Sequence, residues 1–176
     1  MYTLFIDTHD TTNIAIFYND ALLASKICDE GRQSTIIMPL LDELLKNCKL
    51  KIKDINRVLV VNGPGSFTGV RLGVVIAKTI SYLLNIEIRV IDSLRLMAIM
   101  DDNKHSLYGI KDPKGMYLYD KKELKYLSKD ELLDLDITTN VTMLFDKIIK
   151  NVDKFKKTSP ELVNPLYVKN IEVLKW

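Results

Sequence analysis

The chain has 176 residues, of which 47% are hydrophobic and 27% are charged, and its formal net charge is +2. This size allows one domain, or one domain with a smaller lobe, and the composition is ordinary for a globular protein. Because the charges nearly balance, the sequence does not favour tight RNA binding by this chain alone. It has only two cysteines, no signal-peptide pattern and no apolar run of roughly 18 residues. We therefore predict a cytoplasmic location, no disulfide framework and no contact with a membrane.

The first hundred residues predict a compact α/β unit. Strands are expected at 2–7, 13–18, 22–28, 57–61 and 87–91. Helices are expected at 34–48, with Ser34 as the N-cap, at 68–84, and from Ser93 onward. This β-β-β-α-β-α-β-α order predicts a ribonuclease-H-like fold, in which helices cover a mixed sheet.

The remaining residues predict a smaller second lobe. A hairpin is expected around Asp112–Gly115, and Ser128–Glu131 has the form of a capping box that opens a short helix. The pattern over 141–155 fits either a helix or a strand followed by a helix, and 165–169 is predicted to be extended. We therefore expect a ribonuclease-H-like lobe over 1–101 and a reduced lobe over 102–176.

A glycine-rich turn joins the fourth predicted strand to the second long helix. The spacing of Gly63, Gly65 and Gly69 excludes a P-loop and a dinucleotide fingerprint, and the sequence is not that of a nucleophile elbow. Gly69, Gly73 and Ala77 recur four residues apart, so they form a stripe of small residues along the helix. Because glycine destabilises a helix interior by about 1 kcal/mol relative to alanine, the stripe indicates close packing against another backbone.

The polar residues predict no catalytic centre. A nuclease of this fold needs clustered carboxylates, but Asn62 stands where an acid would accompany Asp7. His9 and His105 are interpreted as isolated turn or surface residues, and no spacing predicts a metal site. The turn after Asp7 allows a phosphate contact, although the second lobe has too few glycines to complete an ATP site.

The segment Gly63–Gly73, which reads GPGSFTGVRLG, closely resembles the signature of the bacterial TsaB family, also called YeaZ. Three other segments agree with that family in the right order: Ile6–Ile16, Arg32–Leu45 and Asp92–Leu94. Within the second of these, the family usually has His where this chain has Gln33. Beyond about residue 100 the resemblance is confined to short turn and tail motifs.

The resemblance implies an actin-like ATPase fold and a non-catalytic subunit. Members of the family pair with the related catalytic protein TsaD, helped by the ATPase TsaE. Together these proteins place a threonylcarbamoyl group on N6 of the adenosine next to the tRNA anticodon. TsaD holds a metal through a His-x-x-x-His motif that this sequence does not contain. We therefore expect no enzyme activity, metal or cofactor of its own, ATP or ADP only at the interface of the complex, and contact with tRNA only through the complex.

The resemblance also implies where partners bind, because family members form homodimers or heterodimers through their first two helices. We expect TsaD to bind there, or a second copy of the chain when TsaD is absent. The residues expected at this interface are Ser34, Ile37, Met38, Leu41, Leu45, Gly69, Gly73, Ala77 and Ile80. A secondary nucleotide contact is expected at Asp7, Thr8, Gly65, Ser66 and Arg71. The alternative function is that of a stand-alone nucleotide-binding protein of the actin-like ATPase superfamily.

Overall fold

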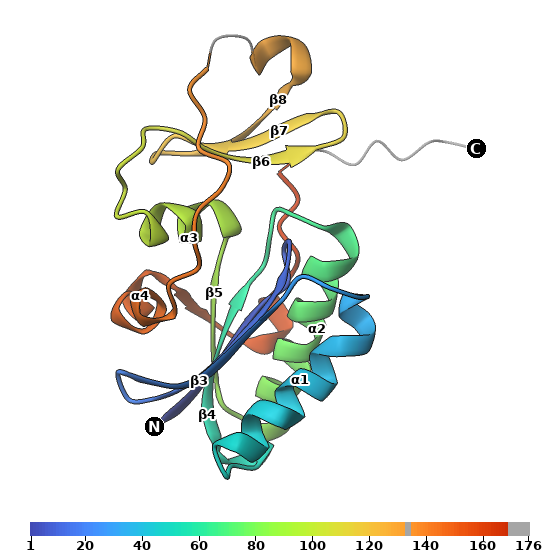
Figure 1. Cartoon of the computed structure of the whole chain (residues 1–176), viewed down its shortest axis with the longest axis vertical. Helices are drawn as coiled ribbons and strands as arrows, with labels where there is room; N and C mark the ends of the chain where they lie inside the picture. Colours follow the sequence, from blue (N-terminus) through green and yellow to red (C-terminus); the bar gives the residue numbers. More distant parts are fainter. Residues whose placement is uncertain (133–134, 169–176) are drawn as a thin grey trace, which may run out of the picture.

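A six-stranded sheet organises the larger part of the structure, a computed structural model that describes residues 1–132 and 135–168 (Figure 1). Its strands are β1 (Tyr2–Asp7), β2 (Thr12–Tyr18), β3 (Ala21–Cys28), β4 (Ile55–Val61), β5 (Glu87–Ile91) and β9 (Lys156–Thr158). They lie in the order β3-β2-β1-β4-β5-β9. Because β1 pairs antiparallel with β2 and parallel with β4, the sheet is mixed, as predicted.

Helices bury both faces of this sheet. They are α1 (Gln33–Asn47), α2 (Phe67–Leu84), α3 (Ser93–Met100) and α4 (Phe145–Lys150). Leu4 and Ile6 of β1 lie in one hydrophobic cluster with α1 and α2, whereas Phe5 lies in another with α3 and α4. This division follows from the strand itself, whose successive side chains point to opposite faces. The α1–α2 pair therefore lies on one side of the sheet and α4 on the other (Figure 1).

A second, three-stranded antiparallel sheet comprises β6 (Tyr108–Asp112), β7 (Gly115–Tyr119) and β8 (Leu124–Ser128). β6 and β7 form the predicted hairpin. β8 is a strand that the sequence does not predict, because its residues do not alternate between apolar and polar. The predicted capping contact after it is present, since the Glu131 carboxylate accepts hydrogen bonds from the Ser128 amide (2.8 Å) and hydroxyl (2.6 Å). The turn that it opens is the 3-10 helix η2 (Lys129–Leu132).

The chain then returns to the first sheet. The rings of Phe145 and Phe155 pack edge-on against Phe5, with centroids 6.4 and 6.5 Å apart, and β9 pairs antiparallel with β5. Some of the described residues beyond 101 thus belong to the first sheet and others to the second. The predicted boundary between two lobes at residue 101 stays a prediction. Residues 169–176 of the predicted second lobe, including Lys169 of the predicted tail, lie outside the described residues. The remaining 3-10 helices are η1 (Ile52–Asp54), η3 (Val152–Lys154) and η4 (Pro160–Leu162).

The first helix is not capped by the predicted residue, whereas the third begins at Ser93 as predicted. α1 begins at Gln33 with Arg32 at the N-cap, so Ser34 is an exposed residue of the first turn. Asp92 caps α3 by accepting a hydrogen bond from the Arg95 amide over 2.8 Å.

Among the described helices, α2 is long and apolar enough to cross a membrane when only its length and composition are considered. The core helices of globular proteins meet the same criterion. α2 packs Gly69, Gly73 and Ala77 against the rest of the chain.

Candidate functional site

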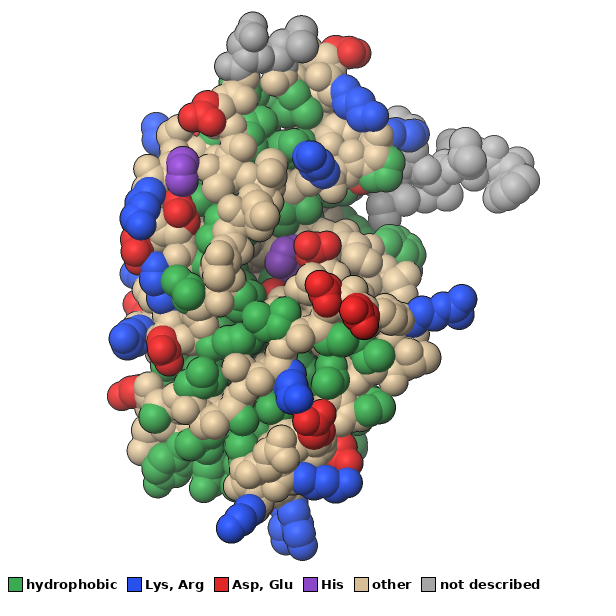
Figure 2. All heavy atoms as spheres, viewed as in Figure 1, with side chains coloured by type: hydrophobic (Ala, Val, Ile, Leu, Met, Phe, Trp, Pro, Cys, Tyr) green, Lys and Arg blue, Asp and Glu red, His purple; other side chains and the backbone are tan. Residues whose placement is uncertain are grey.

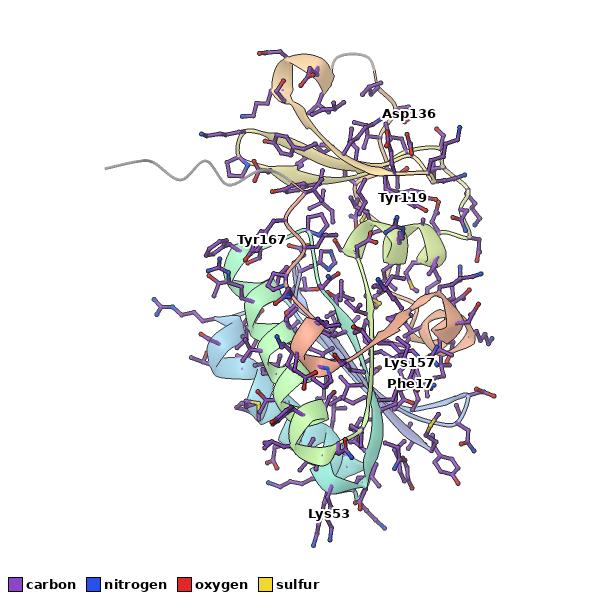
Figure 3. The ribbon with its side chains drawn as sticks, turned by 180° about the vertical axis from the view of Figure 1, so that it is seen from behind. Phe17, Lys53, Tyr119, Asp136, Lys157 and Tyr167 are labelled. Carbon is purple, nitrogen blue, oxygen red and sulfur yellow. The ribbon has the colours of Figure 1, made fainter. Side chains whose placement is uncertain are left out.

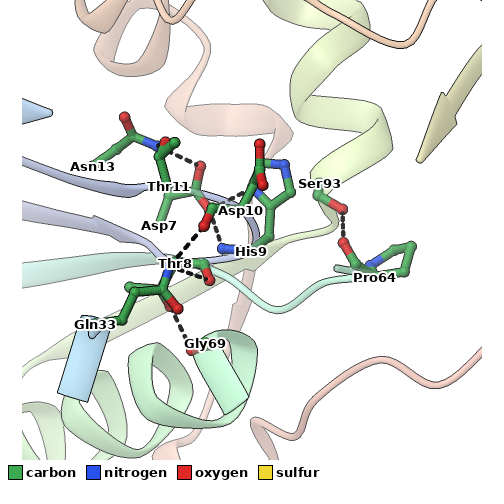
Figure 4. Close-up of polar contacts among 10 residues, drawn as sticks. All are labelled: Asp7, Thr8, His9, Asp10, Thr11, Asn13, Gln33, Pro64, Gly69 and Ser93. Atoms are coloured by element: carbon green, nitrogen blue, oxygen red, sulfur yellow. Dashed lines mark hydrogen bonds and ion pairs between the residues drawn. The ribbon is translucent and has the colours of Figure 1, made fainter. Parts of the chain in front are cut away.

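Two turns meet at the end of the large sheet (Figure 4). One is the β1–β2 turn (residues 8–11), and the other is the glycine-rich turn (residues 62–66) between β4 and α2. Ser93 at the start of α3 holds the second turn, because its hydroxyl donates to the Pro64 carbonyl over 2.5 Å and its amide donates to the Gly63 carbonyl over 2.9 Å. The glycine-rich turn is therefore fixed between α3 and the β1–β2 turn.

The glycines of the family motif leave room for the β1–β2 turn. A Cβ at Gly65 would meet the backbone of His9, and a Cβ at Gly69 would meet the carbonyl oxygen of Thr8. A Cβ at Gly73 would meet the Thr8 hydroxyl. The predicted close packing against another backbone is therefore present, but the neighbour belongs to the same chain.

Hydrogen bonds fix the β1–β2 turn from two helices. The Ser66 amide donates to the His9 carbonyl over 2.6 Å. From α1, the Gln33 amide group donates to the carbonyls of Thr8 (3.2 Å) and Asp10 (2.8 Å). Three consecutive carbonyls of the turn are thus satisfied without solvent, so the turn is held in one conformation.

His9 of the β1–β2 turn is hydrogen-bonded to the buried carboxylate of Asp7 at the end of β1. Asp7 is 0% exposed, and its Oδ1 accepts hydrogen bonds from the His9 amide (3.0 Å) and from His9 Nδ1 (2.7 Å). Its Oδ2 accepts a longer bond from Asn13 Nδ2 (3.4 Å). Burial alone would lower the pKa of His9, but the charge and hydrogen bond of Asp7, with the charge of Asp10, raise this pKa above its ordinary value.

His9 is a turn residue, as predicted, but it is not isolated, because its side chain pairs with Asp7. The sequence places Asp7 and His9 two residues apart at the end of a strand, and the conformation of the turn brings their side chains together. His105 is also paired, since its Nδ1 lies 2.7 Å from Asp101 Oδ2. That second pair lies on the exposed loop between α3 and β6.

A groove runs between the β1–β2 turn and the second sheet. Cavities of about 230 and 540 Å³ share the lining residues His9, Asp10, Met97, Thr139 and Asn140. The larger cavity also reaches the glycine-rich turn and Lys111 of β6. A neighbouring cavity of about 410 Å³ continues past Lys111 to aromatic and proline side chains. We call the space lined by the first two cavities the interlobe groove.

The predicted nucleotide-contact residues are not all in this groove. Gly65 and Ser66 line it, whereas Asp7 and Thr8 are buried behind it. The Arg71 side chain contacts two aromatic residues of the chain itself. Its Nε donates to the Tyr167 hydroxyl over 2.8 Å, and its guanidinium lies 3.6 Å from the centroid of the Phe67 ring. Tyr167 lies beside the start of α2 in Figure 3.

Most of the predicted interface residues lie inside the chain's own core. Those that are buried are Ile37, Leu41, Leu45, Gly69, Gly73 and Ala77. Ser34 and Met38 are exposed, and Ile80 is half-buried. The stripe of small residues faces the sheet and the β1–β2 turn, so it does not form an outer surface. An interface on these two helices stays a proposal. Its residues have to come from the solvent-exposed side of each helix, which faces away from the sheet.

The described residues contain no group of three or more His, Cys, Asp or Glu side chains that could hold a metal ion. Charges of both signs are interspersed on the face shown in Figure 2. The groove is thus lined by one imidazole (His9), one carboxylate (Asp10), one lysine (Lys111) and uncharged polar groups around a fixed turn.

Comparison with known proteins places this geometry in a class. YeaZ from Pseudomonas aeruginosa superposes with a TM-score of 0.72 over 94% of this chain and 99% of that chain, at 13% sequence identity. The chain therefore has the same α/β fold as that protein, with a mixed sheet and a smaller second sheet.

Sequence comparison then shows the family. A family model described as TsaD, tRNA N6-adenosine threonylcarbamoyltransferase, matches residues 31–158. The tRNA threonylcarbamoyladenosine biosynthesis protein TsaB of Bacillus subtilis is 37% identical over 100 residues, which are 56% of this chain and 44% of that protein. The protein of the same name from Buchnera aphidicola subsp. Schizaphis graminum is 30% identical over 159 residues, which are 88% of this chain and 74% of that protein. The chain belongs to the TsaB family, also called YeaZ. Its match spans less than half the length of the Bacillus relative.

Proposed function

We propose that this chain is a non-catalytic scaffold subunit that binds TsaD in the cytoplasm and supports formation of N6-threonylcarbamoyladenosine next to the tRNA anticodon. Membership of the TsaB family supports the pathway, since two relatives carry the name of that biosynthesis. TsaE is the further partner, and tRNA is contacted through the complex. ATP or ADP binds only at the interface of the complex.

The observation that carries the proposal is an apolar outer surface on the α1–α2 pair. Met38 is 53% exposed, Val75 57%, Tyr82 67% and Leu83 74%. On α2, Val75 and Tyr82 lie roughly opposite the buried stripe of Gly69, Gly73 and Ala77, given 3.6 residues per turn, whereas Leu83 is exposed in the last turn of the helix. We define Met38, Val75, Tyr82 and Leu83 as the outer helix surface.

A surface of this kind suits a protein partner. Large apolar side chains exposed on neighbouring helices mark interaction sites more often than isolated ones do. Aromatic and aliphatic side chains also form the energetic centres of helix interfaces. We therefore propose that TsaD binds to the outer helix surface, and that a second copy of this chain binds there when TsaD is absent. The stripe of Gly69, Gly73 and Ala77 is buried and does not contact the partner.

The test is reconstitution of tRNA threonylcarbamoylation from TsaD, TsaE and this chain, together with direct measurement of TsaD binding. We expect Val75→Glu and Leu83→Glu to weaken TsaD binding by about tenfold or more and to lower tRNA modification in parallel. Leu23→Glu on β3 is the matched control, because Leu23 is an exposed apolar residue that belongs to neither α1 nor α2. Undiminished TsaD binding by both α2 variants would contradict the proposed surface.

The same purified proteins distinguish the scaffold function from the alternative function, which is stand-alone nucleotide binding. ATP or ADP binding and hydrolysis are measured with the isolated chain and again with TsaD present. The scaffold proposal predicts binding only in the complex, whereas substantial hydrolysis by the chain alone would favour the alternative.

A further inference from the structure

We infer that a cavity between α3, β7 and η3 binds the base of an unpaired RNA nucleotide, while lysines beside the cavity bind the flanking phosphates. This contact is made by the chain itself and adds to the contact with tRNA through the complex. It goes beyond the proposed scaffold function and does not depend on TsaD binding. The inference rests on the lining of the cavity, on the charges around it and on the lysines next to it.

The cavity has a volume of about 440 Å³ and lies where four parts of the chain meet. These are the end of β5, α3 with the turn after it, the end of β7, and the connection from α4 to η3. Arg95, which lines the cavity, lies roughly on the opposite face of α3 from Met97 and Met100, which line the interlobe groove. α3 therefore separates the two sites. Ile91 and Ala98 are buried and give the cavity an apolar wall.

The polar lining suits a flat ring with hydrogen-bonding edges. The guanidinium of Arg95 lies over the Tyr119 ring, 5.2 Å from its centroid. Unpaired RNA bases stack on aromatic rings and on guanidinium planes. Asn103 and Asn151 also line the cavity, and an asparagine amide can form two hydrogen bonds with the edge of adenine. In the described part of the chain, the Asn103 side chain makes no hydrogen bond, and that of Asn151 makes one, to the Lys147 carbonyl (2.9 Å).

The charges at the cavity itself nearly cancel, which suits an uncharged base. Its charged lining residues are Arg95, Asp102 and Lys154. Asp102 pairs with Lys147 over 2.7 Å, and Arg95 pairs with Asp92 over 2.7 Å. The carboxylate that faces the cavity is thus already neutralised within the chain.

Lysines continue from the cavity along α4 and η3. Lys147, Lys150 and Lys154 are three and four residues apart, so they lie on one face of this segment. Lys150 is exposed and makes no ion pair within the described residues. Lys154 lies 3.5 Å from Asp153, but both side chains are mostly exposed, so this pair is weak. Residues 145–157 contain five lysines and two aspartates, so their net charge of +3 exceeds the +2 of the whole chain. Phosphates on either side of a bound base therefore meet lysine side chains.

The experiment measures binding of the purified chain, without TsaD, to a short fluorescently labelled oligoadenylate RNA by fluorescence anisotropy. We expect saturable binding at low salt that weakens as potassium chloride is added, because phosphate contacts release counterions. A blunt RNA duplex offers phosphates but no unpaired base, and it should bind about tenfold more weakly. Absence of binding at low salt, or equal affinities for the single strand and the duplex, would overturn the inference. Free adenosine monophosphate that competes as well as the unlabelled oligonucleotide would contradict the role of the lysines.

Three variants test the cavity and the lysines separately. Tyr119→Leu removes the stacking ring and should weaken oligoadenylate binding by about tenfold, with thermal unfolding measured to establish that the variant is folded. Lys150→Glu changes only an exposed side chain, and it should weaken binding and make it less dependent on salt. Lys53→Glu is the matched control, because Lys53 is also exposed but lies at the far end of the large sheet from Tyr119 (Figure 3). Native affinity in Lys150→Glu, or an equal loss in Lys53→Glu, would overturn the inference.

Discussion

The hydroxyl of Thr8 donates a hydrogen bond to the carbonyl oxygen of Gly69 over 2.7 Å, and both residues are buried. This bond joins the β1–β2 turn to the first turn of α2 at the point where a side chain on Gly69 or Gly73 would collide with Thr8. The glycine motif of the family thus has a structural purpose in this chain. It seats α2 on the turn that carries Asp7 and His9.

Gly73→Ala should destabilise the chain by about 1–3 kcal/mol, because the new Cβ overlaps the Thr8 hydroxyl. Helix propensity alone would stabilise the variant by about 1 kcal/mol, so a net loss means that the overlap outweighs propensity. The measurement is the free energy of unfolding in urea. Thr8→Ala removes the colliding oxygen, and in that background Gly73→Ala should cost clearly less. Additive effects of the two substitutions would show that the contact is not responsible.

The Asp7–His9 pair should make stability depend on pH. Because the pKa of His9 is raised above its ordinary value of 6.5, the pair contributes stability that is fully present below that value. This contribution is lost as the pH rises through the raised pKa. The free energy of unfolding of the native chain should therefore fall relative to that of His9→Gln across this range. A difference between the two proteins that stays constant with pH would contradict the pair.

Ser93→Ala should cost about 1–3 kcal/mol, since it leaves the buried Pro64 carbonyl without its 2.5 Å hydrogen bond. Ser34→Ala is the matched control, because Ser34 is exposed and its substitution should change unfolding by less than about 0.5 kcal/mol. Urea denaturation of the two variants compares them directly. Similar losses at both positions would indicate a general effect of removing a helical serine.

The large sheet and its first three helices follow from the sequence, because strands such as β1 and β4 are buried on both faces and therefore read as continuous apolar runs. β9 does not follow, since Lys156–Thr158 is short and polar and pairs with β5 only after the chain has passed through a second sheet. The stripe of small residues on α2 predicts close packing, but helical periodicity does not say which backbone will approach. The Asp7–His9 pair depends on the conformation of one short turn, and spacing alone does not determine that conformation.

Arg71 should fasten the segment that contains Tyr167 to α2 rather than stabilise the whole fold. Its contacts with Phe67 and Tyr167 lie at the surface, where a cation–π contact contributes about 0.5–1 kcal/mol. Arg71→Met should thus change global unfolding by less than about 1 kcal/mol but speed amide hydrogen exchange at Leu166, whose N–H donates to the Asn62 carbonyl over 2.7 Å. Tyr167→Phe removes only the hydroxyl and should give a smaller effect at the same amide. Unchanged exchange at Leu166 in Arg71→Met would mean that the bond to Asn62 holds this segment without help from the guanidinium.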